Sequence, residues 1–537
     1  MWHNRAMPPA GSAPAPRVGV FGWGVVAPRS PNVDAFARNL ERGESWLAPF
    51  DGFGPDNFLV GTPEFRFADY EPWIDARFPP GRFPQLVDKM DLPTQYAIGA
   101  FIQSLGQNPG LEEELQRLGT ATHVYVGVGI GALATYHDAA LVLHRAQRRW
   151  DRFWAAPERN AALRAWRDRP PAERGDGDVP ADPETVPAAT RADAEEAWDR
   201  YWMARSPELR AYLEGLRAIE SLAVEGDVDT GKMSLLKEKQ RRRARLQKEW
   251  GAPEPPWTQV TPNLVWNIHN TPASQITMLG RLHGLAFAPV AACSTFGVAL
   301  KLALDAIRRG EARAVVVGAA DPPPHPLSVG AFYAARVIAA DAAVSMPLTT
   351  LRGTHVAGGS VVWIVGDLEH MLERGFRPLG MEPLAVGTSS DAHHIITPSR
   401  DGPILAMRQA LAAAGVEPAE VGSWDLHATA TPGDYLEVAT LRAVVPESVV
   451  VTARKGTFGH GMAACGGWEL TAQYLGYERG RLFPTPLAPG DLNPEIAALG
   501  GCFVADSACP APPGVAGKMS MGIGGVNACV VSRPWPR

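Results

Sequence analysis

Valine- and glycine-rich apolar runs recur along this chain, and each is followed by a segment with helical periodicity. Such runs occur at Val18–Val26, Thr122–Gly131 and Ala312–Ala320. Near-continuous apolar strands are typical of sheets buried on both faces, with helices on either side. The alternation of strands and helices therefore predicts an α/β fold in which buried sheets lie between layers of helices.

A long segment of different composition interrupts this pattern between about residues 133 and 250. It is rich in Arg, Glu, Ala and Trp, and four of its tryptophans form pairs spaced four residues apart. Residues at that spacing share one face of a helix, so we interpret the segment as a helical insertion. The pairs, Trp150 with Trp154 and Trp198 with Trp202, form either the core of a small subdomain or an exposed partner site.

The end of the insertion is basic, whereas the whole chain is mildly acidic. Lys237–Lys248 is either a solvated helix face or a dock for an acidic partner. The formal net charge of −6 gives no reason to expect a nucleic-acid partner. No apolar run approaches the length needed to cross a bilayer, so we expect no membrane span. The five scattered cysteines lack zinc or disulfide spacing, which favours a reducing cytoplasm.

One cysteine lies at the predicted start of a helix. The apolar run Pro289–Leu300 turns at Cys293 and continues with Phe296, Leu300 and Leu304 at helical spacing. Unpaired amides and the positive end of the helix dipole at such a position favour a thiolate over a thiol. Cys293 is therefore a candidate nucleophile, although cysteine also serves as a small buried hydrophobic residue.

Three later loops carry polar residues in stretches otherwise built from small or apolar residues. The first begins at His427 after a predicted strand, and the second contains Lys455, His460 and Glu469. The third, Ser520–Ala528, is a glycine-dense turn that can bring backbone amides against a ligand. Taken singly, each histidine could be structural and Lys455 could be a surface charge.

Together with the Cys293 segment, these loops resemble the β-ketoacyl synthases of the thiolase superfamily. That family has a Cys in a TACSS-like elbow, a His in HGTGT, a Lys and a second His in KSxxGHxxGAAGxxE, and a glycine loop like SFGFGGTNA. Four counterparts occur here in the same order. The resemblance implies an α/β chain with a duplicated, thiolase-like αβαβα five-layer fold and a helical insertion. The expected N-terminal half is residues 17-132 and 251-311, the insertion is 133-250, and the C-terminal half is 312-537.

The resemblance also implies an activity. In that family an acyl group passes from a carrier thioester to the cysteine, and a malonyl-type extender loses carbon dioxide to give an enolate that attacks the acyl-enzyme. We therefore expect a 3-oxoacyl-[acyl carrier protein] synthase that performs this decarboxylative Claisen condensation in fatty acid or polyketide biosynthesis. The open alternatives are a Cys-dependent acyltransferase with a non-malonyl acceptor and a partner subunit of a ketosynthase heterodimer.

Catalytic roles follow from the resemblance, residue by residue. Cys293 would carry the acyl group, and His427 and His460 would donate N–H groups to the enolate oxygen. Lys455 would pair with Glu469 and so order the site.

Substrate-binding roles follow in the same way. Thr429 and Thr431 would hold the pantetheine arm of the carrier. Met521 and Ile523 stand where the family has phenylalanines that gate the acyl chain. The amides of Cys293 and Ile523 would form an oxyanion hole for the acyl carbonyl.

The resemblance implies no metal and no resident cofactor, since phosphopantetheine enters as part of the carrier-bound substrate. The implied partners are an acyl carrier protein and a second subunit, either identical in a homodimer or a related ketosynthase-like chain in a heterodimer.

Two segments depart from the family pattern. The HGTGT loop has become His427-Ala-Thr-Ala-Thr431, whose added methyl groups would reshape the pantetheine tunnel. Arg352–Gly359 lacks the acidic residues of the family's RDGFVxGEG segment. Whether decarboxylation is retained is therefore open at this stage.

Overall fold

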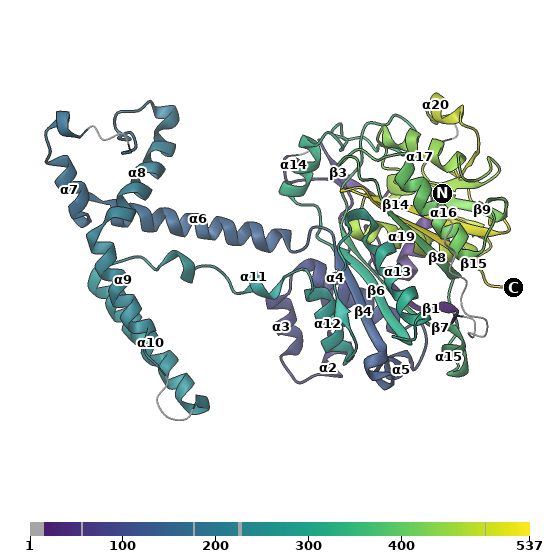
Figure 1. Cartoon of the computed structure of the whole chain (residues 1–537), viewed down its shortest axis with the longest axis horizontal. Coiled ribbons are helices and arrows are strands. Elements are labelled where there is room, and N and C mark those ends of the chain that lie inside the picture. Colours follow the sequence, from purple (N-terminus) through teal and green to yellow (C-terminus); the bar gives the residue numbers. More distant parts are fainter. Residues whose placement is uncertain (1–14, 55–56, 175–177, 224–227, 489, 537) are drawn as a thin grey trace, which may run out of the picture. The chain divides into compact units, whose positions relative to one another are not determined.

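The computed structural model describes residues 15–54, 57–174, 178–223, 228–488 and 490–536. It divides into two compact units. The larger comprises residues up to 134 and from 265 onward, and the smaller comprises residues 135–264 (Figure 1).

The first sheet of the larger unit has the strand order β1-β7-β6-β4-β5. β7 is antiparallel to both β1 and β6, whereas β6, β4 and β5 are parallel. Every residue of its four long strands is buried, as the valine-rich runs predict. The strands are β1 (Val18–Val26), β4 (Thr122–Val128), β5 (Ala286–Phe287), β6 (Ala314–Asp321) and β7 (Gly359–Asp367).

The second sheet repeats this arrangement with the order β12-β10-β9-β14-β15-β8. β15 is antiparallel to both β8 and β14, whereas β14, β9, β10 and β12 are parallel. Apart from the short edge strand β12, both sheets place the first strand of the repeat beside the fifth, then the fourth, second and third. The strands are β8 (Met381–Ser390), β9 (Val421–Asp425), β10 (Val450–Thr452), β12 (Cys502–Phe503), β14 (Val515–Gly522) and β15 (Val526–Pro534).

The repeat corrects one predicted boundary. β6 and β7 belong to the first sheet, so the change from one half to the other lies between Asp367 and Met381. The boundary expected between residues 311 and 312 is too early, because a valine-rich strand gives no sign of which sheet it joins.

Three layers of helices enclose the two sheets. α13 and α19 pack against each other in the middle layer and share one hydrophobic core with both sheets, which includes Trp363 of β7 and Ala528 of β15. α4 and α12 cover the outer face of the first sheet, and α16 and α17 cover that of the second. These helices are α4 (Leu92–Leu105), α12 (Thr271–Gly280), α13 (Thr295–Arg308), α16 (Asp401–Ala414), α17 (Gly433–Arg442) and α19 (Met462–Glu478). The predicted five-layer αβαβα architecture is confirmed.

Shorter elements connect these layers. The helices are α1 (Val33–Leu40), α2 (Glu71–Asp75), α3 (Arg82–Lys89), α5 (Leu111–Arg117), α11 (Asn263–Trp266), α14 (Pro326–Ala334), α15 (Leu368–Glu373), α18 (Lys455–Phe458) and α20 (Pro494–Ala497). The two-residue strands are β2 (Ala48–Pro49), β3 (Leu59–Val60), β11 (Arg481–Leu482) and β13 (Cys509–Pro510).

The smaller unit is helical and has a core of its own. Trp150 and Trp154 are buried against Tyr212, and Trp198 and Trp202 are buried together. The tryptophan pairs are therefore packing residues rather than an exposed partner site. The helices are α6 (Leu133–Ala155), α7 (Ala161–Arg167), α8 (Arg191–Arg205), α9 (Pro207–Glu220) and α10 (Val228–Trp250).

The basic segment of the insertion lies in α10 and is partly neutralised within the unit. Arg241 and Arg242 both pair with Glu238, and Arg243 pairs with Glu220. In the described part of the chain, no helix combines the length and the apolar character needed to span a membrane.

Candidate active site

Cys293 lies in a short 3₁₀ turn at the start of α13. Ala292, the residue before it, has a left-handed φ of +47°, which turns the chain sharply into the helix. Ser294 Oγ donates to the carbonyl oxygens of Ser520 at 3.0 Å and Val526 at 2.7 Å. Hydrogen bonds therefore connect the 3₁₀ turn of Cys293 to the predicted glycine-dense turn.

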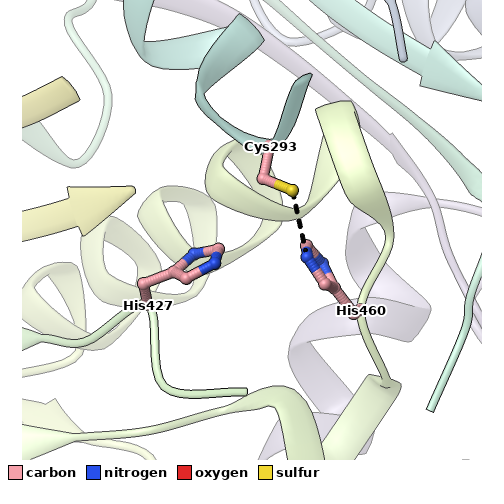
Figure 2. Close-up of side chains that lie close together, drawn as sticks. All are labelled: Cys293, His427 and His460. Atoms are coloured by element: carbon pink, nitrogen blue, oxygen red, sulfur yellow. Dashed lines mark hydrogen bonds between the residues drawn. The ribbon is translucent and has the colours of Figure 1, made fainter. Parts of the chain in front are cut away.

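Two histidines from the second half of the fold face this cysteine. His460 directly precedes α19, the counterpart of α13 in the repeated order, and its Nε2 lies 3.1 Å from Cys293 Sγ. His427 follows β9, and its ring centroid lies 5.3 Å from that of His460. Figure 2 shows the three side chains converging on one place from three separate segments. The structure thus brings together the residues that the resemblance named as the reacting groups.

Both imidazoles are buried and neutral near pH 7. Burial holds the pKa of His427 and of His460 well below the usual range, and the ammonium groups of Lys455 and Lys518 lower both pKa values further. Each ring therefore keeps one N–H donor and one acceptor nitrogen.

The resting nucleophile is a thiol. Burial raises the pKa of Cys293 to about 11, and it outweighs the opposite effects of Lys455 and of the Ile523 backbone amide. The expectation that the helix N-terminus favours a thiolate is therefore wrong for the resting site, because sequence spacing reveals the helix but not the burial. Nε2 of His460 is the adjacent acceptor for the thiol proton.

Lys455 and Glu469 form the predicted ion pair behind the two rings. Lys455 Nζ lies 2.7 Å from Glu469 Oε1, donates to the carbonyl oxygen of His427, and lies 3.4 Å from Nδ1 of the same histidine. The other carboxylate oxygen, Glu469 Oε2, lies 2.8 Å from Nζ of Lys518. The sequence analysis gave no role to Lys518, which stands in an otherwise apolar strand.

Two carboxylates hold the loop after β9. Glu437 accepts hydrogen bonds from the amides of His427 at 2.6 Å and Ala428 at 2.7 Å, and Asp434 accepts one from the amide of Thr429 at 2.8 Å. Burial raises the pKa of Glu437 to about 7 and that of Asp434 to about 6. Both residues follow His427 within ten positions, but this spacing does not reveal that Glu437 fixes the backbone of His427 and that Asp434 fixes the loop after it.

The supporting role of Asp321 was also not predicted, because in the sequence this residue looks like the polar end of an apolar strand. Its carboxylate accepts hydrogen bonds from the amides of Gly129 at 3.0 Å, Ile130 at 2.8 Å and Ala463 at 2.7 Å. It therefore ties the loop after β4 to the first turn of α19. Burial raises the pKa of Asp321 to about 7.

A cavity of about 550 Å³ reaches Cys293 and both histidines. All four predicted substrate-binding residues line it, namely Thr429, Thr431, Met521 and Ile523. The hydroxyl oxygens of the two threonines lie 2.9 Å apart. Another part of the wall, which includes Phe332 of α14, was not predicted from the sequence. Lys455 and Glu469 are not among the lining residues and support the site from behind.

The segment that lacks the family's acidic residues contains a buried histidine. His355 Nδ1 donates to the carbonyl oxygen of Leu59 at 3.0 Å, and its Nε2 accepts from the amide of Ser345 at 2.8 Å. The carbonyl oxygen of His355 accepts from the amide of His460 at 2.7 Å. Burial lowers the pKa of His355 to about 4, so this neutral ring is a fixed support for the His460 backbone.

The thiol and imidazole atoms of Cys293, His427 and His460 lie within 4.8 Å of one another, a spacing that one metal ion could bridge. Lys455 and Lys518 place positive charge next to the two rings. These charges oppose binding of a dication there.

Two family models match this chain. The model of the β-ketoacyl synthase N-terminal domain matches residues 229–369, and the model of the C-terminal domain matches residues 382–487. The gap between the two matches coincides with the change from the first sheet to the second. The chain contains both domains of the β-ketoacyl synthase family.

Curated relatives of this chain share about a third of the aligned residues. The 3-oxoacyl-[acyl-carrier-protein] synthase I of Arabidopsis thaliana chloroplasts is 32% identical over 216 residues, which are 38% of this chain and 45% of the relative. Nodulation protein E of Rhizobium sp. (strain N33) is 29% identical over 237 residues, 42% of this chain and 58% of the relative. The chain thus spans about half the length of the curated relatives it matches.

Solved structures of similar fold show that this chain has the thiolase-like fold. The ishigamide ketosynthase/chain length factor matches 97% of this chain with a TM-score of 0.65 and 20% identity, over 100% of its own chain. The ketosynthase ApeO in complex with its chain length factor ApeC, from Xenorhabdus doucetiae, matches 100% of both chains with a TM-score of 0.63 and 16% identity.

Proposed function

We propose that this protein is a β-ketoacyl synthase that condenses an acyl thioester with a malonyl-type thioester, with loss of carbon dioxide, through an acyl group on Cys293. The observation that carries the proposal is the approach of Cys293 Sγ to within 3.1 Å of Nε2 of the neutral His460, with a second neutral ring, His427, at the same cavity.

The acylation step uses the cysteine, one histidine and two amides. Sulfur of Cys293 attacks the thioester carbonyl as its proton passes to Nε2 of His460. The amides of Cys293 and Ile523, both directed at this sulfur, would donate to the developing oxyanion. Collapse of the tetrahedral intermediate expels the carrier thiolate, which takes the proton back from His460.

The condensation step uses both neutral rings as donors. The extender loses carbon dioxide, and its enolate oxygen accepts an N–H from His427 and another from His460, whose ring takes the Nε2–H tautomer once acylated Cys293 no longer donates to that nitrogen. The enolate carbon attacks the carbonyl of acyl-Cys293, and the sulfur leaves as thiolate and takes up the one proton that each turnover consumes from solvent. Two charged imidazolium rings would repel each other at this spacing, so neutrality of both rings suits the chemistry.

The proposed partners are an acyl carrier protein and a second ketosynthase-like subunit. One structural neighbour is an acyl-carrier protein in complex with its ketosynthase, with a TM-score of 0.62, and others pair a ketosynthase with a chain length factor. We propose that the pantetheine arm passes Thr429 and Thr431, and that the protein needs no resident cofactor. Five free cysteines agree with a cytoplasmic location.

The test starts from protein loaded with an acyl thioester at Cys293. Malonyl-carrier is added, and both carbon dioxide release and the mass of the carrier-bound product are followed, with Cys293→Ala as control. We expect a β-ketoacyl-carrier to form together with carbon dioxide, and neither product in the control.

Two other outcomes would overturn the proposal. A proven acyl-enzyme that ignores malonyl-carrier but acylates an amine, an alcohol or water would identify an acyltransferase with another acceptor. Failure to load Cys293 at all, even though a related chain restores activity, would identify a noncatalytic partner subunit.

A further inference from the structure

A second lysine stands behind the two catalytic rings. Lys518 lies in β14, which ends at Gly522 directly before Ile523, and its side chain is 1% exposed. Its Nζ lies 2.8 Å from Glu469 Oε2 and 3.4 Å from the carbonyl oxygen of Leu426, the residue before His427. Lys518 therefore touches the supports of both rings, α19 through Glu469 and the end of β9 through Leu426.

Glu469 is consequently held between two ammonium groups. Lys455 binds one of its oxygens at 2.7 Å, and Lys518 binds the other at 2.8 Å. The chain of contacts continues from Lys518 to Asp425 at 4.0 Å and from Asp425 to Arg454 at 2.8 Å. This buried network contains three basic and two acidic side chains, so it carries an excess positive charge where no water screens it.

We infer that Lys518 is a positioning residue of the condensation step, which keeps His427 and His460 neutral and in place through Glu469 and the Leu426 carbonyl. The inference rests on the proposed function and deepens it. Lys518 lies behind the rings and is not among the residues that line the cavity, so it acts through them rather than on substrate.

The effect of Lys518 on the two rings can be separated from that of Arg454, another buried cation of the network. Lys455 and Lys518 both act on the two rings, whereas Arg454 contributes to the pKa of neither. Arg454 is also 1% exposed and shares Asp425 with Lys518. Arg454 is therefore a matched control for the loss of a buried charge in the same network.

The glycine-dense turn has supports other than Lys518, whose ammonium also donates to the carbonyl oxygen of Met519 directly before it. The β14–β15 pairing runs from Ala516 to Gly522, and Ser294 Oγ holds the carbonyl oxygens of Ser520 and Val526. Loss of the Lys518 charge should therefore spare the oxyanion amide of Ile523 and the loading of Cys293.

Other charged groups surround the rings and are not mutated in the test, although removal of the Lys518 charge also acts to raise the pKa of Asp425, Glu437 and Cys465. The acidic ones are Asp321, Asp425, Asp434, Glu437 and Glu469, and the remaining ones are Lys455 and the thiols of Cys293 and Cys465. On the cavity side, the titratable or charged residues in the lining also include Arg336, Asp391 and His394.

The decisive variant is Lys518→Met, which keeps the length of the side chain and removes its charge. Glu469 keeps Lys455 and Asp425 keeps Arg454, so neither carboxylate loses its last partner. We expect at least a tenfold lower condensation rate, normal loading of Cys293, and an acidic limb of the pH–rate profile that moves up by about one to two pH units. Arg454→Met should leave that limb in place.

Histidine NMR measures the same effect without turnover. Ring signals of His427 and His460, assigned by His→Gln variants, should titrate at higher pH in Lys518→Met than in the wild type and in Arg454→Met. If Lys518→Met does not fold, the same titration in Lys518→Gln decides. Unchanged ring titration, or an equal shift in Arg454→Met, would overturn the inference. Failure of the wild-type protein to condense would instead refute the proposed function, and the NMR result would still decide on Lys518.

Discussion

Sγ of Cys293 lies 3.1 Å from Nε2 of His460, and in the resting site the proton between them belongs to sulfur. Because the thiol has a pKa of about 11 and the ring a strongly lowered one, the pair is a neutral dyad rather than a thiolate–imidazolium ion pair. Substrate binding, not the resting electrostatics, has to trigger proton transfer.

Alkylation of the free enzyme should show this neutral dyad. The rate of iodoacetamide addition to Cys293 should keep rising through pH 8 to 10, since the thiolate fraction grows about tenfold per pH unit below the pKa. Mass spectrometry of the Cys293 peptide separates it from Cys502, which is exposed. A rate that is already level at pH 7 would show a thiolate and contradict the neutral dyad.

The two histidines should differ in the step that they affect. Replacing either ring with alanine removes a donor to the enolate, which typically costs ~10²–10³ in rate. His460→Ala should also slow loading, because it removes the proton acceptor beside Sγ, whereas His427→Ala should load normally. Acyl-enzyme formation and carbon dioxide release, followed separately, check this. Equal loading defects in both variants would argue against the assignment.

His355 should make the fold acid-sensitive. Its pKa is about 4 in the folded protein and near 6.5 in the unfolded chain, so the unfolded state binds more protons between these values. The contribution of His355 to the free energy of unfolding is thus fully present above the pKa of the unfolded chain. It falls as the pH drops, by about 2 kcal/mol between pH 7 and pH 5. Urea unfolding at both pH values measures it, and His355→Gln should show a smaller loss than the wild type. An unchanged loss would assign the acid sensitivity to other groups.

The core of the insertion should depend on its buried tryptophans. Trp154 is 1% exposed, whereas Trp257 of the same unit is 58% exposed. Trp154→Ala should destabilise the smaller unit by about 3–5 kcal/mol, and Trp257→Ala should change little. Thermal unfolding followed by tryptophan fluorescence compares the two. Similar losses in both variants would contradict the packing role.

The basic helix α10 offers a test for carrier recognition. Lys237, Arg245 and Lys248 are exposed and have no ion-pair partner among the described residues. If an acidic carrier docks there, changing all three to Glu should raise KM for carrier-bound substrate about tenfold and leave small thioesters unaffected. Equal losses with both kinds of substrate would exclude this dock.

The sequence was sufficient for the layers and for the three residues that the structure brings together at the cavity, because both leave local patterns. Buried strands are visible as valine runs, and Cys293, His427 and His460 each stand in a short motif. The sequence did not predict which sheet β6 and β7 join, since strand pairing is a long-range property that no local pattern records.

The electrostatics of the site were equally hidden. A single lysine in a strand, such as Lys518, normally indicates a solvent-facing position, and only the structure shows that it is buried beside Glu469. The pKa of Cys293 was misjudged for the same reason, because burial depends on segments far away in the chain. Asp321 likewise binds amides from residues 129, 130 and 463, which no spacing rule connects.

The repeated strand order makes the two halves of the fold similar, but the residues of the candidate site are divided unequally between them. Cys293 stands before α13 of one repeat, and His427 and His460 come from the other. Each repeat therefore holds only part of the candidate site. If the proposed function holds, the contact between α13 and α19 is as necessary for the reaction as the sulfur of Cys293, because it keeps the two parts of the site together.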